Sequence, residues 1–329
     1  MKKYLGDVMD VAVVAAMAVA GVLFWQGVAA AQQVTVYTAG PQGLANALSK
    51  GFTAKTKAKV NLFQGTTGQV MAKIAAEAAN PQVDVLISAS WDTAPDMKEK
   101  GLLLSYMSPN AKNVPDSLKD EFYVAQGAAA LSIVWNSKTG KPKPTDWADL
   151  AKPEYQGQVT MPDPAASGSA YGLVSGLVAN PKLGWKFFET MKANGTAVVG
   201  ANAAALNPVM QGAKSAVFGA VDYIPIGAKA KGEAIEIIYP ATGTVLEARP
   251  MMIMKSTENP EQAKQFIDYV LSEEGQKLVA DVYLLPARTD IAAKRAGWKD
   301  IKLLPADANA TMQKRNETLA KFKTTMGLK

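Results

Sequence analysis

A run of small and hydroxyl-bearing residues stands immediately before an apolar helical stretch. Residues 162–172 read PDPAASGSAYG, and Tyr171 and the apolar residues after it recur at helical spacing. A helix start offers unpaired N–H groups and about half a positive charge, and a glycine lets an oxyanion approach the backbone. The stretch therefore predicts either an ordinary N-cap or an anion site. The residues at this helix start are Ser167, Gly168, Ser169 and Ala170.

A second loop of similar chemistry follows a strand-like run at residues 60–63. It reads Gly-Thr-Thr-Gly at 65–68, and it offers two hydroxyls and a flexible backbone at the start of another predicted helix. Thr66 or Thr67 is a natural N-cap, and the loop, Gly68 included, is a candidate for the same ligand or for a second part of it. Further candidates at equivalent strand ends are Thr38, Ala39, Ser88, Ser90 and Trp91.

Two acids and a tyrosine lie in strand-like segments. These segments are close to the places where the chain is predicted to pass from one domain to the other. Asp222 and Glu247 are candidates for buried carboxylates, which need a partner. An ammonium group or sugar hydroxyls of a ligand could supply that partner, and for Glu247 so could Arg249. Tyr223 could donate a hydrogen bond to an organic ligand, stack on it, or pack within a hinge.

The residue types and motifs that the sequence lacks exclude several kinds of catalysis. The chain has no histidine and no cysteine, so Ser-His-Asp and Cys-His mechanisms are excluded, as are zinc sites with nitrogen or sulfur ligands. It has neither a Gly-x-Gly-x-x-Gly nor a Walker-type loop. An exported carboxylate-dependent hydrolase is the remaining enzyme alternative, and it requires two acids about 5–10 Å apart in a cleft.

The N-terminus has the three-part layout of a secretory signal. Lys2 and Lys3 precede an apolar stretch at 11–25, and the small residues 29–31 then form a cleavage pattern. We expect residues 1–31 to be a signal peptide cleaved near Ala31, which places the mature protein in the periplasm. An uncleaved membrane anchor is the alternative, although the apolar stretch is shorter than the ~20 residues of a spanning helix.

The remaining residues, about 300, suffice for two domains. The formal net charge is +6, but the lysines are scattered and aromatic residues do not interleave with them, so nucleic-acid binding is not expected. Strand-like runs at 34–37, 60–63 and 83–87 are each followed by a helical pattern. This alternation predicts parallel sheets covered on both faces, with ligands beyond the carboxyl ends of the strands.

From residue 128 onward the sequence predicts longer strands and helices. Residues 128–136 form a predicted strand near the first crossover, and the strand-like region at 234–254 is expected to cross back. The apolar stripe within 260–271 predicts a core helix. The tail at 307–329 predicts a charged amphipathic helix, with Met312, Leu319 and Phe322 as candidate contacts.

In this order and spacing the chain resembles a periplasmic solute-binding protein of an ABC importer. More narrowly, it resembles the ferric-ion, 2-aminoethylphosphonate and hexose-phosphate binding group. The segments that carry the resemblance are 34–37, Asp84-Val85 before the serines, 145–150, 162–171 and 259–276.

The resemblance implies an α/β fold of type II, with two Rossmann-like lobes joined by a two-strand hinge and the ligand cleft between them. The implied bounds are 32–125 with 246–300 for lobe 1, 126–245 for lobe 2 and 301–329 for a C-terminal helical segment. It also implies that the Ser167 hydroxyl and the amides of residues 168–170 hold a phosphate or a synergistic anion. The implied protein is a monomeric receptor without cofactor, not an enzyme, which serves an ABC permease and its ATPase.

The same resemblance raises an iron-binding alternative. Ferric binders of this group use a Tyr-Tyr pair, usually with a histidine and a carboxylate. Here the corresponding place reads Asp222-Tyr223, and the carboxylate expected near Thr66 is absent. Tyr223 alone would remain as a metal ligand. The favoured ligand is a phosphonate or a phosphorylated small molecule, with 2-aminoethylphosphonate or a sugar phosphate as leading cases, and ferric iron is the alternative.

Overall fold

The computed structural model describes residues 32–295, 297, 300–305 and 308–328. The predicted signal peptide, residues 1–31, lies outside the described residues. Residues 33–329 belong to one structural unit, and the account below concerns the described part of that unit. Within this described part, no helix combines the length and the apolar character needed to cross a membrane.

The first sheet begins with parallel strands, as the alternation predicted. Its order is β2-β1-β3-β11-β6, in which β1 pairs in parallel with β2 and β3, and β11 is antiparallel to both β3 and β6. The principal strands are β1 (Gln33–Thr38), β2 (Lys59–Gln64), β3 (Val85–Ile87), β6 (Tyr123–Asn136) and β11 (Leu246–Met254). Short strands β4 (Leu103–Leu104), β5 (Lys119–Asp120) and β12 (Leu285–Pro286) pair with β11 or β6.

A helix follows each of the strands β1, β2 and β3, as the alternation predicted. In α2, the side chains of Leu44, Leu48 and Phe52 are buried, and their i, i+4, i+8 spacing places them on one face of the helix. We call this sheet with its helices the first lobe. Its helices are α2 (Gln42–Thr56), α3 (Thr67–Ala76), α4 (Thr93–Glu99), α9 (Pro260–Val270) and α10 (Glu273–Asp281), with 3₁₀ turns η1 (Pro109–Asn113) and η2 (Asp116–Leu118).

A second group of strands continues from β6. It comprises β9 (Ala216–Val221), β7 (Val159–Met161), β8 (Ala197–Val198) and β10 (Ile235–Ile238). We call these strands and their helices the second lobe. The helices are α5 (Gly168–Val178), α6 (Gly184–Ala193), α7 (Asn202–Met210) and α8 (Tyr223–Ala230), with 3₁₀ turns η3 (Trp147–Ala151) and η4 (Pro153–Tyr155).

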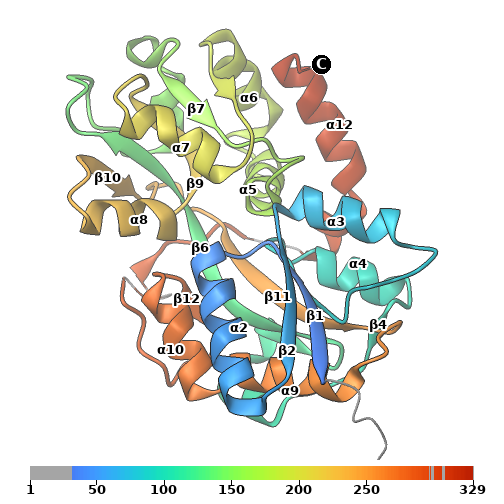
Figure 1. Ribbon diagram of the computed structural model, residues 1–329. Coiled ribbons are helices and arrows are strands. Elements are labelled where there is room, and N and C mark those ends of the chain that lie inside the picture. The colour runs from blue at the N-terminus through green and yellow to red at the C-terminus, as the bar shows by residue number, and fades with distance from the viewer. Residues whose placement is uncertain (1–31, 296, 298–299, 306–307, 329) are drawn as a thin grey trace, which may run out of the picture. The chain divides into compact units, whose positions relative to one another are not determined.

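Two strands connect the lobes, as expected. In β6, residues 123–130 pair with β11 of the first lobe, whereas residues 131–136 pair with β9 and β10 of the second. The chain returns through β11, which follows β10. Figure 1 shows β6 running from one group of strands into the other, with β11 beside it. The carboxyl ends of β1, β2 and β3 therefore lie near the place where the chain crosses.

The C-terminal segment forms two helices, α11 (Ala308–Gln313) and α12 (Arg315–Met326), where the sequence predicted one. In α12, Phe322 and Met326 are buried, and the Phe322 ring lies 5.7 Å from the Phe188 ring of α6. Met312 and Leu319, the other predicted contacts, are only partly buried. Figure 1 shows α12 beside α6 of the second lobe.

Candidate functional site

The start of α5 presents two amide groups that have no acceptor. Ser167 is the N-cap, and its Oγ accepts a hydrogen bond from Ala170 N at 3.3 Å. The N–H groups of Gly168 and Ser169 have no hydrogen-bond acceptor among the described residues. Because this first turn contains no acidic side chain, the partial positive charge of the helix start is not neutralised there. The helix start is thus capped by Ser167 and still leaves two N–H groups unpaired, so the geometry is compatible with both sequence interpretations.

Asn202 holds the hydroxyls at this helix start. Its Nδ2 donates to Ser167 Oγ at 2.8 Å and to Ser169 Oγ at 3.3 Å, and its Oδ1 accepts from Val221 N at 3.2 Å. The two serine hydroxyls are 3.1 Å apart. Sequence analysis missed Asn202, because only the pairing of β7 with β8 and β9 brings the start of α7 next to the start of α5.

The loop at 65–68 faces the start of α5 from the first lobe. Thr66 is occupied as the N-cap of α3, where it forms a capping box with Gln69. Thr67 Oγ1 is buried and has no partner among the described residues. Gly68 N donates to Ala166 O at 3.4 Å, so the loop touches the second lobe directly. Of the two predicted hydroxyls, the one on Thr67 is the one available to a ligand.

The loop after β3 packs against the same helix start. A Cβ atom at Gly168 would lie 2.6 Å from Ser90 Cβ and 2.9 Å from Thr67 Oγ1, so only a glycine permits this approach. The hydroxyls of this loop are engaged locally: Ser88 Oγ lies 2.9 Å from Thr93 Oγ1, and Ser90 Oγ donates to Asp92. Ser90 therefore shapes the contact between the lobes.

Thr38 and Ala39 lie at the end of β1, and their polar groups already have partners. Thr38 Oγ1 accepts from Gly40 N at 2.9 Å. Ala39 N donates to Ile87 O at 2.8 Å, and Ala39 O accepts from Arg249 Nη2 at 2.6 Å. This pair shapes a turn beside β11 and contacts Arg249.

The two acidic candidates differ in what surrounds them. Asp222 is fully buried and is held by the protein itself. Its Oδ2 lies 2.5 Å from Arg295 Nη2 and also accepts from Tyr239 Oη and Ala130 N. Its other oxygen is buried without a partner. Asp222 thus serves chiefly to join the second lobe to the segment that carries Arg295.

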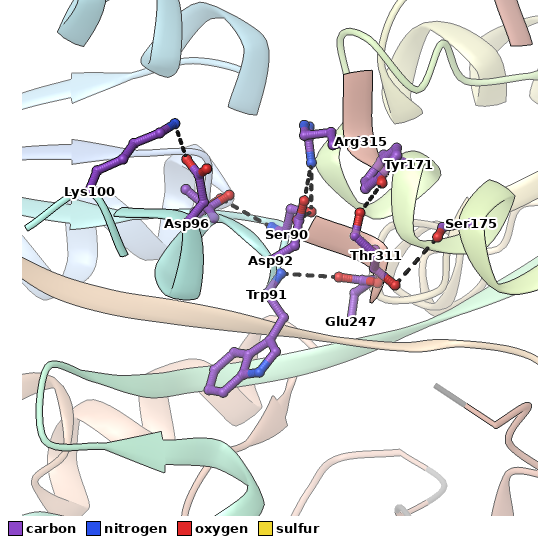
Figure 2. Close-up of polar contacts among 12 residues, drawn as sticks. Ser90, Trp91, Asp92, Asp96, Lys100, Tyr171, Ser175, Glu247, Thr311 and Arg315 are labelled. Carbon is purple, nitrogen blue, oxygen red and sulfur yellow. Dashed lines mark hydrogen bonds and ion pairs between the residues drawn. The ribbon is translucent and has the colours of Figure 1, made fainter. Parts of the chain in front are cut away.

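Glu247 has far fewer partners. Its Oε2 accepts from Trp91 N at 3.3 Å, and it makes no ion pair, not even with Arg249, within the described residues. Burial, together with the charge of Asp92, raises the pKa of the Glu247 carboxyl well above its usual value. The carboxyl lies against α5, since a Cβ atom at Gly172 would be 1.7 Å from Glu247 Oε1. Figure 2 shows Glu247 and its contact with Trp91.

A cavity of about 680 Å³ borders this carboxyl. Its walls come from the loop after β3, from the small-residue face of α5, from β11 and from α12. Residues that line it include Trp91, Asp92, Gly172, Ser175, Trp185 and Glu247. Its size is in the range of small-molecule sites in proteins. Two predicted site residues, Trp91 and Glu247, are thus brought to one cavity.

The C-terminal helices bridge the two lobes beside this cavity (Figure 2). Arg315 Nη1 lies 2.7 Å from Asp92 Oδ2 in the first lobe. The same guanidinium lies 4.2 Å from the ring centre of Tyr171 in the second lobe. Tyr171 Oη donates to Thr311 O. Sequence analysis did not identify Arg315, because its partners are far away along the chain.

Tyr223 is placed beside a positive charge. The Arg249 guanidinium lies 5.8 Å from the centre of its ring, and burial raises the pKa of the Tyr223 hydroxyl. Asp222, its neighbour in sequence, is paired with Arg295. In addition, no cluster of three acidic groups suited to a metal ion occurs in the part of the chain that the structure describes.

A two-lobed α/β chain with two connecting strands and unpaired amides between the lobes is a binding protein of the type II periplasmic class. Residues 80–310 match the model of the bacterial extracellular solute-binding protein family, and the chain belongs to that family. Proteins of this kind serve ABC transporters as their periplasmic binding components. The predicted fold class and family are confirmed.

Relatives with assigned names differ in their ligands. A putative 2-aminoethylphosphonate-binding periplasmic protein of Salmonella typhimurium is 26% identical over 257 residues, 75% of each chain. Iron uptake protein A1 of Synechocystis is 26% identical over 270 residues, 76% of this chain and 74% of the relative. The structure of AfuA from Actinobacillus pleuropneumoniae, with exogenous fructose-6-phosphate bound, matches with a TM-score of 0.83 at 23% identity, covering 91% of this chain and 99% of that chain.

Proposed function

We propose that this protein captures a phosphonate or a phosphorylated small molecule in the periplasm and delivers it to an ABC permease and its ATPase. It acts as a monomer, without catalysis, after cleavage of its signal near Ala31. The observation that carries the proposal is the pair of unpaired amides at Gly168 and Ser169, with the Ser167 hydroxyl and the free Thr67 hydroxyl beside them. Such a helix start favours a tetrahedral oxyanion.

The remainder of the ligand has candidate partners near Glu247. Its carboxyl is buried, has a single hydrogen-bond donor and borders the cavity, so an ammonium group or a hydroxyl of the ligand would supply what the protein does not. This supports 2-aminoethylphosphonate, the ligand in the name of the Salmonella relative, and sugar phosphates alike.

Ferric iron is less well supported. At the place where ferric binders carry two tyrosines, this chain has Asp222, which is ion-paired with Arg295, and Tyr223, which lies beside Arg249. Two guanidinium groups at that place would repel a trivalent cation. The hydrolase alternative has no comparable support, since the family role is solute binding.

A ligand panel tests the proposal. The mature protein is titrated calorimetrically with 2-aminoethylphosphonate, 2-hydroxyethylphosphonate, hexose phosphates, inorganic phosphate and Fe³⁺. We expect one-to-one binding of at least one organophosphorus ligand, a higher melting temperature and an unchanged ligand after incubation. Stabilisation by Fe³⁺ alone, with a reddish charge-transfer band, would contradict the proposal.

A matched pair of variants connects the result to the helix start. Gly168→Val places a side chain against Ser90 and Thr67 and should abolish ligand-induced stabilisation, while circular dichroism shows a folded protein. Gly43→Ala is the control, because a Cβ atom at Gly43 meets nothing within 4 Å. Equal ligand responses of Gly168→Val and the wild type would show that the anion binds elsewhere.

A further inference from the structure

Arg249 is a buried guanidinium without an acidic partner. The sequence contains four arginines, and three of them pair with a carboxylate: Arg288 with Asp290, Arg295 with Asp222 and Arg315 with Asp92. Arg249 makes no ion pair with any described residue, although it is only 2% exposed. Glu247, two residues earlier on β11, interacts with the guanidinium electrostatically but does not form an ion pair with it. Burying a charge without an ion pair is costly, so an anion bound beside Arg249 would stabilise it.

The guanidinium retains unused donors. Its Nη2 donates to Ala39 O at 2.6 Å, but its Nε is buried and has no acceptor in the described part of the chain. A carbonyl accepts the bond without neutralising the charge. The planar guanidinium is suited to a carboxylate or phosphate, which can accept two parallel hydrogen bonds.

The surroundings of Arg249 join both lobes. It lies on the connecting strand β11, it contacts the turn after β1 of the first lobe through Ala39, and it lies 5.8 Å from the ring centre of Tyr223, the first residue of α8 in the second lobe. The neighbouring strand β3 leads into the loop that packs on Gly168. Arg249 is therefore positioned where the lobes meet, on a different element from the anion-binding start of α5.

We infer that Arg249 binds a second anionic group of the ligand, so that the preferred ligands are phosphonates or phosphate monoesters that also carry a carboxylate. The inference rests on the proposed function, because it assigns the second charge of a ligand whose phosphorus-bearing end is held at α5. It disfavours both leading candidates, because neither 2-aminoethylphosphonate nor the phosphate ester of an uncharged sugar carries a second anion for Arg249.

Two matched ligand pairs test this inference by calorimetry on the mature protein. The first pair is 3-phosphoglycerate and glycerol 3-phosphate, and the second is 3-phosphonopropionate and ethylphosphonate. We expect the carboxylate-bearing member of at least one pair to bind about tenfold more tightly or better, as a charge-assisted hydrogen bond allows. Equal affinities within both pairs, or a preference for 2-aminoethylphosphonate over 3-phosphonopropionate, would overturn it.

Variants of Arg249 assign the effect to this side chain. In Arg249→Met the affinity ratio within the responding pair should fall to near one, and in Arg249→Lys it should fall only partly, because the charge remains while the planar fork is lost. An undiminished ratio in Arg249→Met would refute the assignment. If Arg249→Met does not fold, the Arg249→Lys ratio decides alone.

The outcomes also distinguish this inference from the proposed function. If no phosphonate or phosphate ester binds, the proposed function itself fails. If esters bind and the carboxylate brings no gain, the proposed function stands and only the role of Arg249 falls.

Discussion

The amides of Gly168 and Ser169 differ from most buried N–H groups, which nearly always have a partner in a folded protein. Neither has an acceptor within the described residues, and Thr67 Oγ1 beside them is likewise without one. Three unsatisfied groups on one small surface indicate a site that a ligand completes. At this scale the arrangement is suited to the proposed oxyanion, held by backbone dipoles.

Glu247 supplies a prediction about pH at the same scale. Burial raises its pKa in the folded protein above the ordinary value of 4.5, so the folded state holds this proton more tightly than the unfolded chain. The contribution of Glu247 to stability is therefore fully present below pH 4.5 and is lost as the pH rises through the raised pKa. Glutamine has no proton to lose.

We therefore expect Glu247→Gln to gain in melting temperature relative to the wild type as the pH rises from 4 to 8, by about 2 °C or more. The measurement is a series of thermal melts of the ligand-free proteins. Glu273→Gln is the control, because Lys277 lowers the pKa of the exposed Glu273 and the trend should be reversed and small. A pH-independent difference between Glu247→Gln and the wild type would contradict the role of burial.

At the scale of elements, the proposed site combines the starts of α5 and α7. Asn202 at the start of α7 holds both serine hydroxyls of α5 and accepts from Val221 N at the end of β9. We expect Asn202→Ala to weaken binding of the ligand found in the panel at least about tenfold and to lower stability by about 1–2 kcal/mol. Calorimetric titration and denaturant unfolding measure the two effects.

Asn207→Ala provides the comparison, since Asn207 is exposed on the same helix. It should change neither quantity appreciably. If Asn202→Ala bound the ligand as tightly as Asn207→Ala, the two helices would not form a shared site.

Whether a feature could be predicted depends on how far apart its residues lie in the sequence. The helix start at 167–170 could be predicted because the small residues and the helical spacing are adjacent in the chain, and the N-cap role of Thr66 followed from the same local logic. The contacts of Asn202, Arg249 and Arg315 could not be predicted, because their partners lie 35, 210 and 223 residues away. Only the strand order brings those residues together, and hydrophobic patterning does not specify it.

Asp222 is a residue that the sequence marked as a candidate but whose partner in the fold could not be predicted. Its residue type and position marked it as a candidate ligand group, but nothing local indicated that Arg295 would pair with it. The overall class of fold was predictable, because alternating strands and helices are a pattern of the whole chain.

For the molecule as a whole, the structure has the two lobes in contact. Gly68 of the first lobe donates to Ala166 of the second, and Arg315 touches Asp92 on one side and Tyr171 on the other. Binding proteins of this architecture work by hinge closure around a ligand. Arg315 of the C-terminal helices therefore connects the two lobes in this arrangement.

Arg315→Met should shift the population away from closure and lower ligand affinity about three- to tenfold, because it removes a charge-assisted contact between the lobes. Small-angle X-ray scattering should show a larger radius of gyration with subsaturating ligand than for the wild type. Lys323→Met is the control, since Lys323 is exposed on the same helix and does not line the cavity. Identical behaviour of the two variants would contradict a bridging role for Arg315.

Amide NMR of the labelled mature protein can show whether the N–H groups at the start of α5 donate hydrogen bonds to the anion. On titration with the best phosphonate or phosphate ester of the panel, the amide protons of Gly168 and Ser169 should move strongly downfield. The amide proton of Gly157, which already donates to Asn194 O, should stay in place. Saturating binding that leaves the Gly168 and Ser169 resonances unmoved would contradict the account.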